Sequence, residues 1–237
     1  MSRTATTLAM RIVTGIVLGS LLSCNGSSNS FEENLDITIC DPAAGPFSIV
    51  VNNPYLPLVV GTQSTFQGND GGDALELIVT VLDETQVVAG VTTRVVEERE
   101  SANGELVEIS RNFFVQAPDG TVCYFGEDVA IYENGVVVDS AGQWRAGLNS
   151  AIPGIFMPAD PAVGQAFRQE VAPGVAEDRV EIVAAGETVV VPFGTFTNTI
   201  RFRETTPLEP GASSTKVYAR DFGQIVDDVV RLISQTP

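Results

Sequence analysis

Histidine is absent from the 237-residue chain, which narrows the chemistry that its side chains can perform. Ser-His-Asp triads, zinc sites with histidine ligands and histidine general bases are excluded. Carboxylate pairs could still act as acid and base, and the acidic clusters are Glu97-Glu98-Glu100, Glu127-Asp128, Glu177-Asp178 and Asp227-Asp228. Neighbours in a strand point to opposite faces, so adjacent acids do not converge. We therefore expect the first cluster to be a solvated strand face, and the protein not to be an enzyme.

A short glycine-rich stretch has the composition of a calcium-binding loop. In Gly68-Asn69-Asp70-Gly71-Gly72-Asp73, the side chains of Asp70 and Asp73 would supply carboxylate oxygens. The stretch lacks the length and the distal glutamate of an EF-hand, so a plain exposed turn is the alternative. The sequence also has no glycine-rich phosphate loop, and we expect no cofactor.

Aromatic residues from several segments could line a ligand cavity, because a small curved antiparallel sheet can hold an apolar molecule on its concave side. The alternative is that these rings fill an ordinary core. If a cavity exists, we expect Tyr124 and Trp144 in its wall and the polar residues Glu127, Arg145 and Glu170 at its mouth. The aromatic set comprises Phe113, Phe114, Tyr124, Phe125, Trp144, Phe156, Phe167 and Tyr218.

The N-terminus has the parts of an export signal. Arg3 and Arg11 supply positive charge, and residues 12–22 form an apolar run that is too short for a membrane-spanning helix of about 20 residues. Leu21-Leu22-Ser23-Cys24 then resembles the lipobox of bacterial lipoproteins. An ordinary secretory signal with a chance cysteine is the alternative.

The lipobox resemblance implies that residues 1–23 are removed and that the thiol of Cys24 carries diacylglycerol. The domain would then sit outside the cytoplasm, anchored to a membrane of the cell envelope by its lipid. Asn25 follows the cysteine, where an aspartate is the inner-membrane retention signal in enteric bacteria, so we expect the outer membrane.

Two cysteines remain after Cys24, namely Cys40 and Cys123. An even pair in an oxidising compartment predicts a disulfide bond. This bond would tie an N-terminal arm to the folded domain. Two separate buried thiols are the alternative.

The net charge of the chain is −17, and Lys216 is its single lysine. Such a surface repels phosphate backbones, so we exclude nucleic acid as a partner. The charge serves either solubility or the attraction of cations or a basic partner.

The pattern after the arm predicts an all-β fold. Residues 24–45 read as tether and arm, and residues 46–237 show alternating β-branched and aromatic runs without helical periodicity. Asn103-Gly104, Asp119-Gly120 and Asn134-Gly135 predict tight hairpins, because these residues tolerate positive φ. We expect one antiparallel barrel or sandwich of about eight to ten strands.

An internal match suggests that the domain is two copies of one β-meander. Residues 90–100 align without gaps with residues 194–204, and four of these eleven positions are identical. The halves would be residues 58–140 and 160–237, each covering the apolar face of the other. Gly90 and Gly194 would then occupy equivalent turns. A chance match is the alternative.

The second half contains Val191-Pro192-Phe193-Gly194-Thr195-Phe196, followed by Val217-Tyr218-Ala219 and then Gly223. This pattern resembles uncharacterised bacterial envelope proteins, which are similar in outline to the curved sheets of outer-membrane lipoprotein carriers. The resemblance implies a fold and no reaction.

Two functions follow as alternatives. The first is a non-enzymatic envelope lipoprotein that binds a small apolar ligand or a partner protein. The second is a structural or interaction module with an acidic surface, able to attract cations, without a small ligand. An enclosed apolar cavity would favour the first function and a filled interior the second.

Overall fold

The computed structural model describes residues 31–237, so the signal peptide 1–23 and Cys24 lie outside the described residues. Strands make up 61% of the structure and helices 3%, which confirms the all-β prediction. The helices are two short 3-10 turns in the arm, η1 (Ile37–Cys40) and η2 (Pro42–Ala44). No helix in this part of the chain is long and apolar enough to cross a membrane.

Two runs of antiparallel strands form most of the structure, and we call them the first and the second meander. The first meander consists of β3 (Gln63–Asp70), β4 (Asp73–Val88), β5 (Val91–Ala102), β6 (Glu105–Gln116) and β7 (Val122–Glu133). The second meander consists of β11 (Ala166–Arg168), β12 (Arg179–Val191), β13 (Gly194–Thr205), β14 (Ser214–Ala219), β15 (Gly223–Asp227) and β16 (Val230–Thr236). The remaining strands are β1 (Val51–Asn53), β2 (Leu56–Leu58), β8 (Val136–Asp139), β9 (Trp144–Arg145) and β10 (Gly154–Met157).

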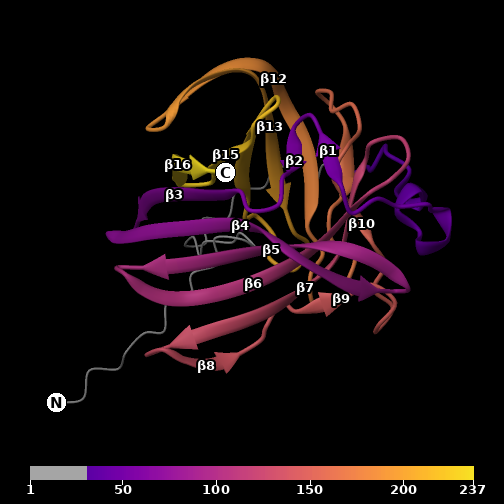
Figure 1. The fold of residues 1–237 in the computed structure, drawn as a ribbon, viewed down its shortest axis with the longest axis horizontal. Helices are drawn as coiled ribbons and strands as arrows, with labels where there is room; N and C mark the ends of the chain where they lie inside the picture. The colour runs from indigo at the N-terminus through magenta and orange to yellow at the C-terminus, as the bar shows by residue number, and fades with distance from the viewer. Residues whose placement is uncertain (1–30) are drawn as a thin grey trace.

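The two meanders belong to one antiparallel sheet of 14 strands, in which β16 pairs with β3 and so joins them. The sheet does not close into a barrel and is instead sandwich-like. In Figure 1 the strands of the first meander run across the view, whereas β12 and β13 run up it. The 14 strands exceed the expected eight to ten, because the two meanders contribute eleven strands and the segment between them adds the short strands β8, β9 and β10.

The predicted hairpins are present. Asn103 and Gly104 form the turn between β5 and β6 with φ values of 54° and 82°, and Asn134 and Gly135 do the same between β7 and β8 with 52° and 75°. These positive angles suit Asn and Gly far better than other residues.

At the two turns, the sequence match between residues 90–100 and 194–204 is offset by one residue from the structural match. Val88 pairs with Val91, so Gly90 lies in the turn itself with a φ of 80°. Val191 instead pairs with Gly194, which is therefore the first residue of its strand and has no positive φ. The prediction that the two glycines occupy equivalent turns is wrong.

Further along the strand, a bulge in β13 compensates for this one-residue offset, so that the sequence match and the structural match agree again. Thr199 pairs with Glu187 and Phe196 with Val189, so two residues of β13 stand opposite one residue of β12. Asn198 within this bulge has a φ of 54°. One extra residue reverses the face on which each following side chain lies. Beyond the bulge, Glu100 and Glu204, which end the matched segments, are both buried.

Candidate functional site

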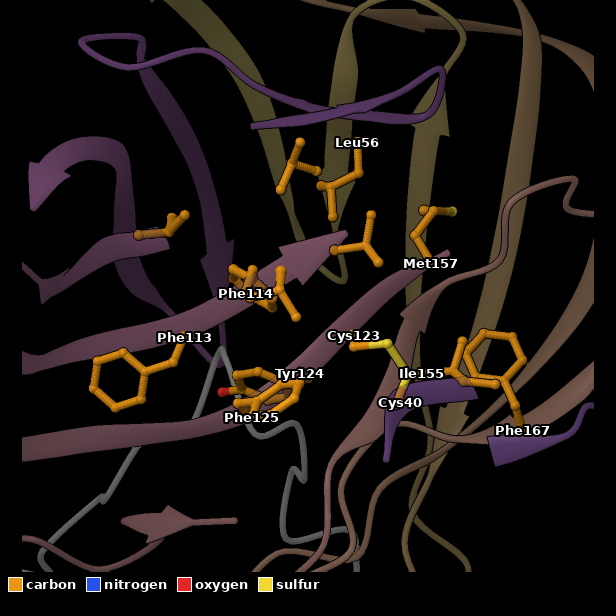
Figure 2. Packing of buried hydrophobic residues seen from close by; sticks show 14 of the residues in the cluster. Cys40, Leu56, Phe113, Phe114, Cys123, Tyr124, Phe125, Ile155, Met157 and Phe167 are labelled. Carbon is orange, nitrogen blue, oxygen red and sulfur yellow. A yellow bond between two sulfur atoms is a disulfide. The ribbon is translucent and has the colours of Figure 1, made fainter. Parts of the chain in front are cut away.

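Four of the predicted aromatic residues, Phe114, Tyr124, Trp144 and Phe156, pack against one another. Figure 2 shows Phe114 and Tyr124 among the buried residues of the larger core cluster. Phe114 stacks on Tyr124 with ring centroids 4.9 Å apart, and Phe156 lies edge-on to Phe114 at 4.6 Å. The ring of Trp144 meets Tyr124 edge-on at 5.3 Å. Contacts of this kind stabilise a core. The packing therefore favours the filled interior over a cavity for a large apolar ligand.

A small polar cavity, which we call the polar chamber, lies beside these rings between the two meanders. Its volume is about 20 Å³, enough for about one water-sized species. Tyr124 donates a hydrogen bond to Oδ1 of Asn112 at its wall. The chamber is lined by Glu98, Asn112, Tyr124, Phe156, Gln169, Glu170, Asp178, Lys216 and Gln224.

The structure brings four of the five predicted binding residues to this region. Tyr124 and Glu170 line the chamber, and Trp144 packs behind Tyr124. Glu127 is buried and lies opposite Asn112 in the strand pair β6–β7. Arg145 does not reach the chamber.

Arg145 makes its contacts elsewhere. Its Nε donates to Oδ1 of Asp128 at 3.0 Å, its Nη2 donates to Oδ2 at 2.5 Å, and its guanidinium lies over the ring of Phe113. Because Asp128 follows Glu127 in β7, the two carboxylates point to opposite faces of the sheet. The arginine thus neutralises the outer acid and leaves the inner one without a basic partner.

Lys216 is the buried cation of the chamber. Its Nζ lies 3.3 Å from Oε2 of Glu204, which also accepts a hydrogen bond from Ser214 Oγ at 3.3 Å. Burial lowers the pKa of Lys216, but Glu204 and Asp227 raise it further, so that its pKa lies well above the usual value. The lysine therefore stays charged and paired inside the sheet.

Several buried carboxyl groups surround this single lysine. Burial raises the pKa of Glu98 to about 7 against the opposing effect of Lys216, and burial together with Glu108 raises the pKa of Glu127 to about 8. Burial and the nearby Asp178 raise the pKa of Glu170 well above its usual value. Burial of the charged form is the largest cause of all three shifts, and Lys216 offsets it only in part for Glu98 and Glu170.

The expectation that Glu97, Glu98 and Glu100 form a solvated face is wrong for two of the three. Glu97 lies on the outer face, with its Oε2 3.0 Å from Nη2 of Arg111. Glu98 and Glu100 point inward, and Glu100 is 1% exposed. Strand alternation separates these faces, but the sequence alone did not show which face was inside. Lys216, Glu204 and Asp227 belong to the same buried cluster, and no local sequence pattern predicted that they meet.

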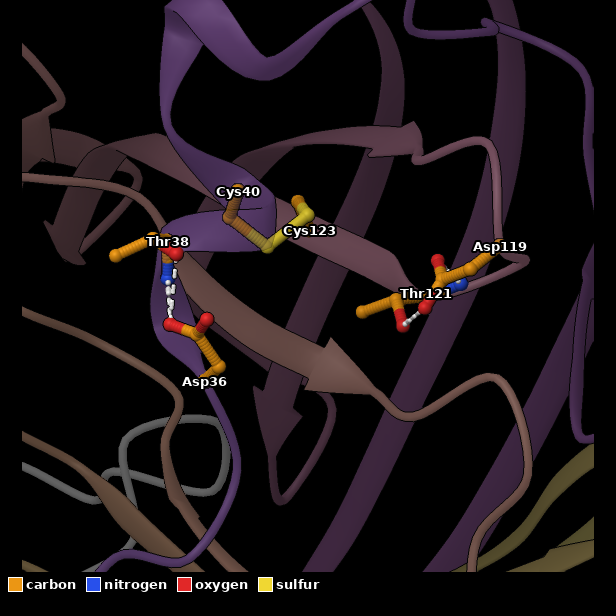
Figure 3. The surroundings of a disulfide bond; sticks show 6 residues. All are labelled: Asp36, Thr38, Cys40, Asp119, Thr121 and Cys123. Atoms are coloured by element: carbon orange, nitrogen blue, oxygen red, sulfur yellow. Dashed lines mark hydrogen bonds between the residues drawn. A yellow bond between two sulfur atoms is a disulfide. The ribbon is translucent and has the colours of Figure 1, made fainter.

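The structure joins Cys40 and Cys123 by a disulfide bond, with their Cα atoms 5.6 Å apart. The bond fastens η1 of the arm to β7, as Figure 3 shows. Both cysteines are fully buried. The arm is thereby held against the sheet.

An open groove, which we call the arm groove, lies between this arm, the turn before β7 and the segment after β10. Its volume is about 670 Å³. Asp36 and Asp119 each accept a hydrogen bond from the threonine that lies two residues later in the chain (Figure 3). Thr38 N–H donates to Asp36 Oδ1 at 2.9 Å, and Thr121 N–H donates to Asp119 Oδ1 at 2.9 Å. The groove is lined by Leu35, Asp36, Thr38, Ile39, Ala44, Pro118, Asp119, Thr121, Ile155, Pro158, Ala159, Asp160 and Gln165.

The proposed calcium loop is a two-residue hairpin turn. Asp70 pairs with Asp73 across Gly71 and Gly72, and Oδ1 of Asp73 accepts a hydrogen bond from Asn103 at 2.8 Å. Within residues 31–237, no group of three or more potential protein ligands has an arrangement that could hold a metal ion. The turn therefore does not gather the oxygens that calcium needs.

Comparisons with known proteins found no matching family model, no matching curated protein and no matching solved structure.

Proposed function

We propose that this protein is a lipid-anchored envelope protein that binds a positively charged, partly apolar segment of a partner protein in the arm groove. The observation that carries the proposal is the groove itself, which is apolar within and acidic at its rim. The proposal includes the removal of residues 1–23 and the lipidation of Cys24.

The volume and the lining of the arm groove suit such a segment. Its volume of about 670 Å³ lies within the range of about 300–1,000 Å³ typical of ligand sites. Leu35, Ile39 and Ile155 offer apolar surface, while the side chain of Asp160 is exposed at the rim. The described lining contains no lysine or arginine. A segment with apolar and basic side chains would complement this surface.

Threonine residues hold two carboxylates of the groove in place by hydrogen bonds. The side chain and the backbone N–H of Thr38 donate hydrogen bonds to Asp36 and lower the pKa of its carboxyl group. Asp119 likewise accepts hydrogen bonds from the backbone N–H and the hydroxyl of Thr121, which fix the position of its carboxylate. Negative charge at fixed positions raises the association rate with a basic partner and selects against acidic ones.

The interior gives less support to a small apolar ligand. The apolar void beside Phe114 and Phe156 has a volume of about 60 Å³, well below that of typical ligand pockets. We therefore adopt the binding of a partner protein rather than the binding of a small apolar ligand.

Titration of the purified domain with a short Lys/Leu peptide and its Glu/Leu counterpart tests the proposal. We expect the Lys/Leu peptide to bind, and Asp160→Lys to weaken that binding by about tenfold, since it reverses one rim charge. Asp139→Lys makes the same charge change on the exposed strand β8, far from the groove, and should leave binding unchanged. Equal binding of both peptides, or equal losses in both variants, would refute the proposal.

The lipid anchor has a separate test. Cys24→Ser should abolish incorporation of a fatty-acid analogue during growth, because the thiol is the acylated group. Equal labelling of this variant and the natural protein would contradict lipidation at Cys24.

A further inference from the structure

Two turns of the structure have the same sequence, Asn-Gly, but different surroundings. Asn103-Gly104 connects β5 to β6, and Asn134-Gly135 connects β7 to β8. Their φ values nearly coincide, at 54° and 82° in the first turn and at 52° and 75° in the second. Any difference in reactivity between the two folded turns must therefore come from the residues around them. A third such pair, Asn25-Gly26, lies outside the described residues.

Asparagine followed by glycine is open to deamidation, because glycine has no Cβ atom to hinder its backbone nitrogen. In this reaction the nitrogen of Gly135 attacks Cγ of Asn134 and forms a new C–N bond. The bond from Cγ to Nδ2 breaks, and ammonia leaves with the proton of the attacking nitrogen. Water then opens the five-membered imide at one of its two carbonyl carbons, which yields aspartate or isoaspartate. Water is the only co-reactant, and nothing is oxidised or reduced.

The attack requires a rotation about the Cα–C bond of the asparagine, out of the turn conformation. The rate in the folded protein therefore depends on how readily the turn opens. It also depends on how firmly neighbouring groups hold the side-chain amide.

The side chain of Asn103 is held by the first two residues of β4. Its Nδ2 donates to Oδ1 of Asp73 at 2.8 Å, and its Oδ1 accepts from the backbone N–H of Ala74 at 3.0 Å. The backbone N–H of Asn103 also donates to the oxygen of Ala74 at 2.7 Å. The strands that it connects, β5 and β6, have 12 residues each and pair with a further strand on either side. Both the amide and the turn are therefore fixed.

The turn at Asn134 has none of this support. Its side chain is exposed, and no other described residue forms a hydrogen bond or ion pair with it. Strand β8, which follows the turn, has four residues that are all exposed. Among the described strands it pairs only with β7. A short edge strand with little buried surface opens at a low free energy, so this turn can reach the reactive conformation.

We propose that Asn134 is a site of spontaneous deamidation, and that isoaspartate formed there releases β8 from β7. Isoaspartate places one extra methylene group in the main chain. Glu133 pairs with Val136 across a turn of only two residues, and such a turn is specific in its backbone geometry. The longer main chain no longer fits it, and the three other pairs of this hairpin cannot hold β8 alone. The reaction also adds one negative charge at the tip, and it does not involve the arm groove.

Ageing of the purified natural protein at mildly alkaline pH, followed by peptide mapping with mass spectrometry, tests the proposal. We expect Asn134 to lose its amide at least about tenfold faster than Asn103, since two side-chain hydrogen bonds and a firmer hairpin protect the latter. In urea, where neither turn is folded, the two rates should become similar. Asp73→Ala removes the acceptor of Asn103 Nδ2, so it should accelerate the loss at Asn103 and leave the rate at Asn134 unchanged.

The release of β8 has its own measurement. In the isoaspartate form, nuclear Overhauser contacts between Tyr132 and Val137, which are paired in the hairpin, should disappear. Asn134→Asp adds the same charge without lengthening the main chain and should retain these contacts. Equal rates at Asn103 and Asn134 in the folded protein, or no reaction at Asn134 while the protein in urea reacts, would overturn the site. Contacts that persist in the isoaspartate form would overturn the release of β8.

Discussion

The polar chamber and the arm groove are both acidic, yet their carboxyl groups behave in opposite ways. In the chamber, burial raises the pKa of Glu98 to about 7. In the groove, hydrogen bonds from Thr38 lower the pKa of the exposed Asp36. Strand β10 separates the two sites, since Ile155 lines the groove and Phe156 lines the chamber. The net charge of −17 therefore combines acids that hold their charge with acids that tend to lose it.

Removing the disulfide bond should have the largest effect on stability, and it should first release the arm that borders the groove. The bond closes a loop with a sequence separation of 83, for which the chain-entropy model gives about 4 kcal/mol of stabilisation. We expect the free energy of unfolding to fall by about that amount in the double variant Cys40→Ala/Cys123→Ala, as measured by urea denaturation. A reductant should destabilise the natural protein and leave the variant unaffected. Equal stability of the two proteins would show that packing alone holds the arm.

Replacing the buried acid Glu127 by glutamine should change how stability depends on pH. Its folded pKa of about 8 lies above the usual glutamate value of 4.5, so the folded state binds the proton more tightly than the unfolded state. The stability present below about pH 4.5 is therefore lost progressively as the pH rises toward 8.

Glu127→Gln removes this loss, because an amide does not titrate. Relative to the natural protein, we expect the variant to gain about 4 kcal/mol near pH 8 and to gain nothing near pH 4. Denaturation at both pH values measures the difference. Glu97→Gln, on the outer face, serves as the control, and an identical gain in both variants would argue against a buried ionisable cluster.

Gly154 is the first residue of β10, the strand that lies between the chamber and the arm groove. A Cβ atom at this position would lie 2.1 Å from the backbone oxygen of Gln169. Gly154→Ala should therefore push β10 away from the chamber-lining segment and cost about 2 kcal/mol, within the range for overpacking. Because Ile155 of β10 lines the arm groove, we expect peptide binding to weaken as well. Unchanged peptide binding in a destabilised Gly154→Ala variant would show that β10 can shift without disturbing the groove.

The smallest effects concern the turns at the ends of the meanders. Gly90→Ala should cost about 1 kcal/mol, because Gly90 has a positive φ that alanine resists. Gly194→Ala should change stability by less than about 0.5 kcal/mol, since nothing lies within 4 Å of its Cβ position and its φ is not positive. Thermal unfolding of both variants measures the contrast, and equal losses would restore the one-to-one match of the two glycines.

The sequence predicted the features that local residue preferences determine. Asn103-Gly104 and Asn134-Gly135 specify tight turns by themselves, and the strands between such turns follow from alternation. The disulfide partners could be named because only two cysteines remained after Cys24. These inferences need no knowledge of how distant segments meet.

The chamber depends on such distant contacts and was only partly predicted. Tyr124 and Glu170 could be predicted because they lie in or beside the aromatic set in the sequence. Lys216 reaches the chamber from β14 of the second meander, which no local pattern indicated. Alternation placed Glu97 and Glu98 on opposite faces without showing which face the second meander would cover. The bulge at Asn198 also shifted the faces of β13 by one residue, which no local pattern indicated. The arm groove lies between segments without strand or helix periodicity, so no pattern in the sequence predicted that a groove forms there.

The fastening of the arm has a mechanical consequence for an anchored protein. Arg168 holds Glu33 through Nε at 2.6 Å and Nη2 at 3.1 Å, and the disulfide follows at Cys40. If Cys24 is held in a membrane, the seven residues up to Phe31 span at most about 25 Å, so the arm stays close to the bilayer. A pull on the anchor would load the contact of Phe31 with Arg179 and the Glu33–Arg168 pair, and then pass through the covalent bond directly into β7. The chain between the two cysteines, which includes β3 to β6, is bypassed and carries no tension.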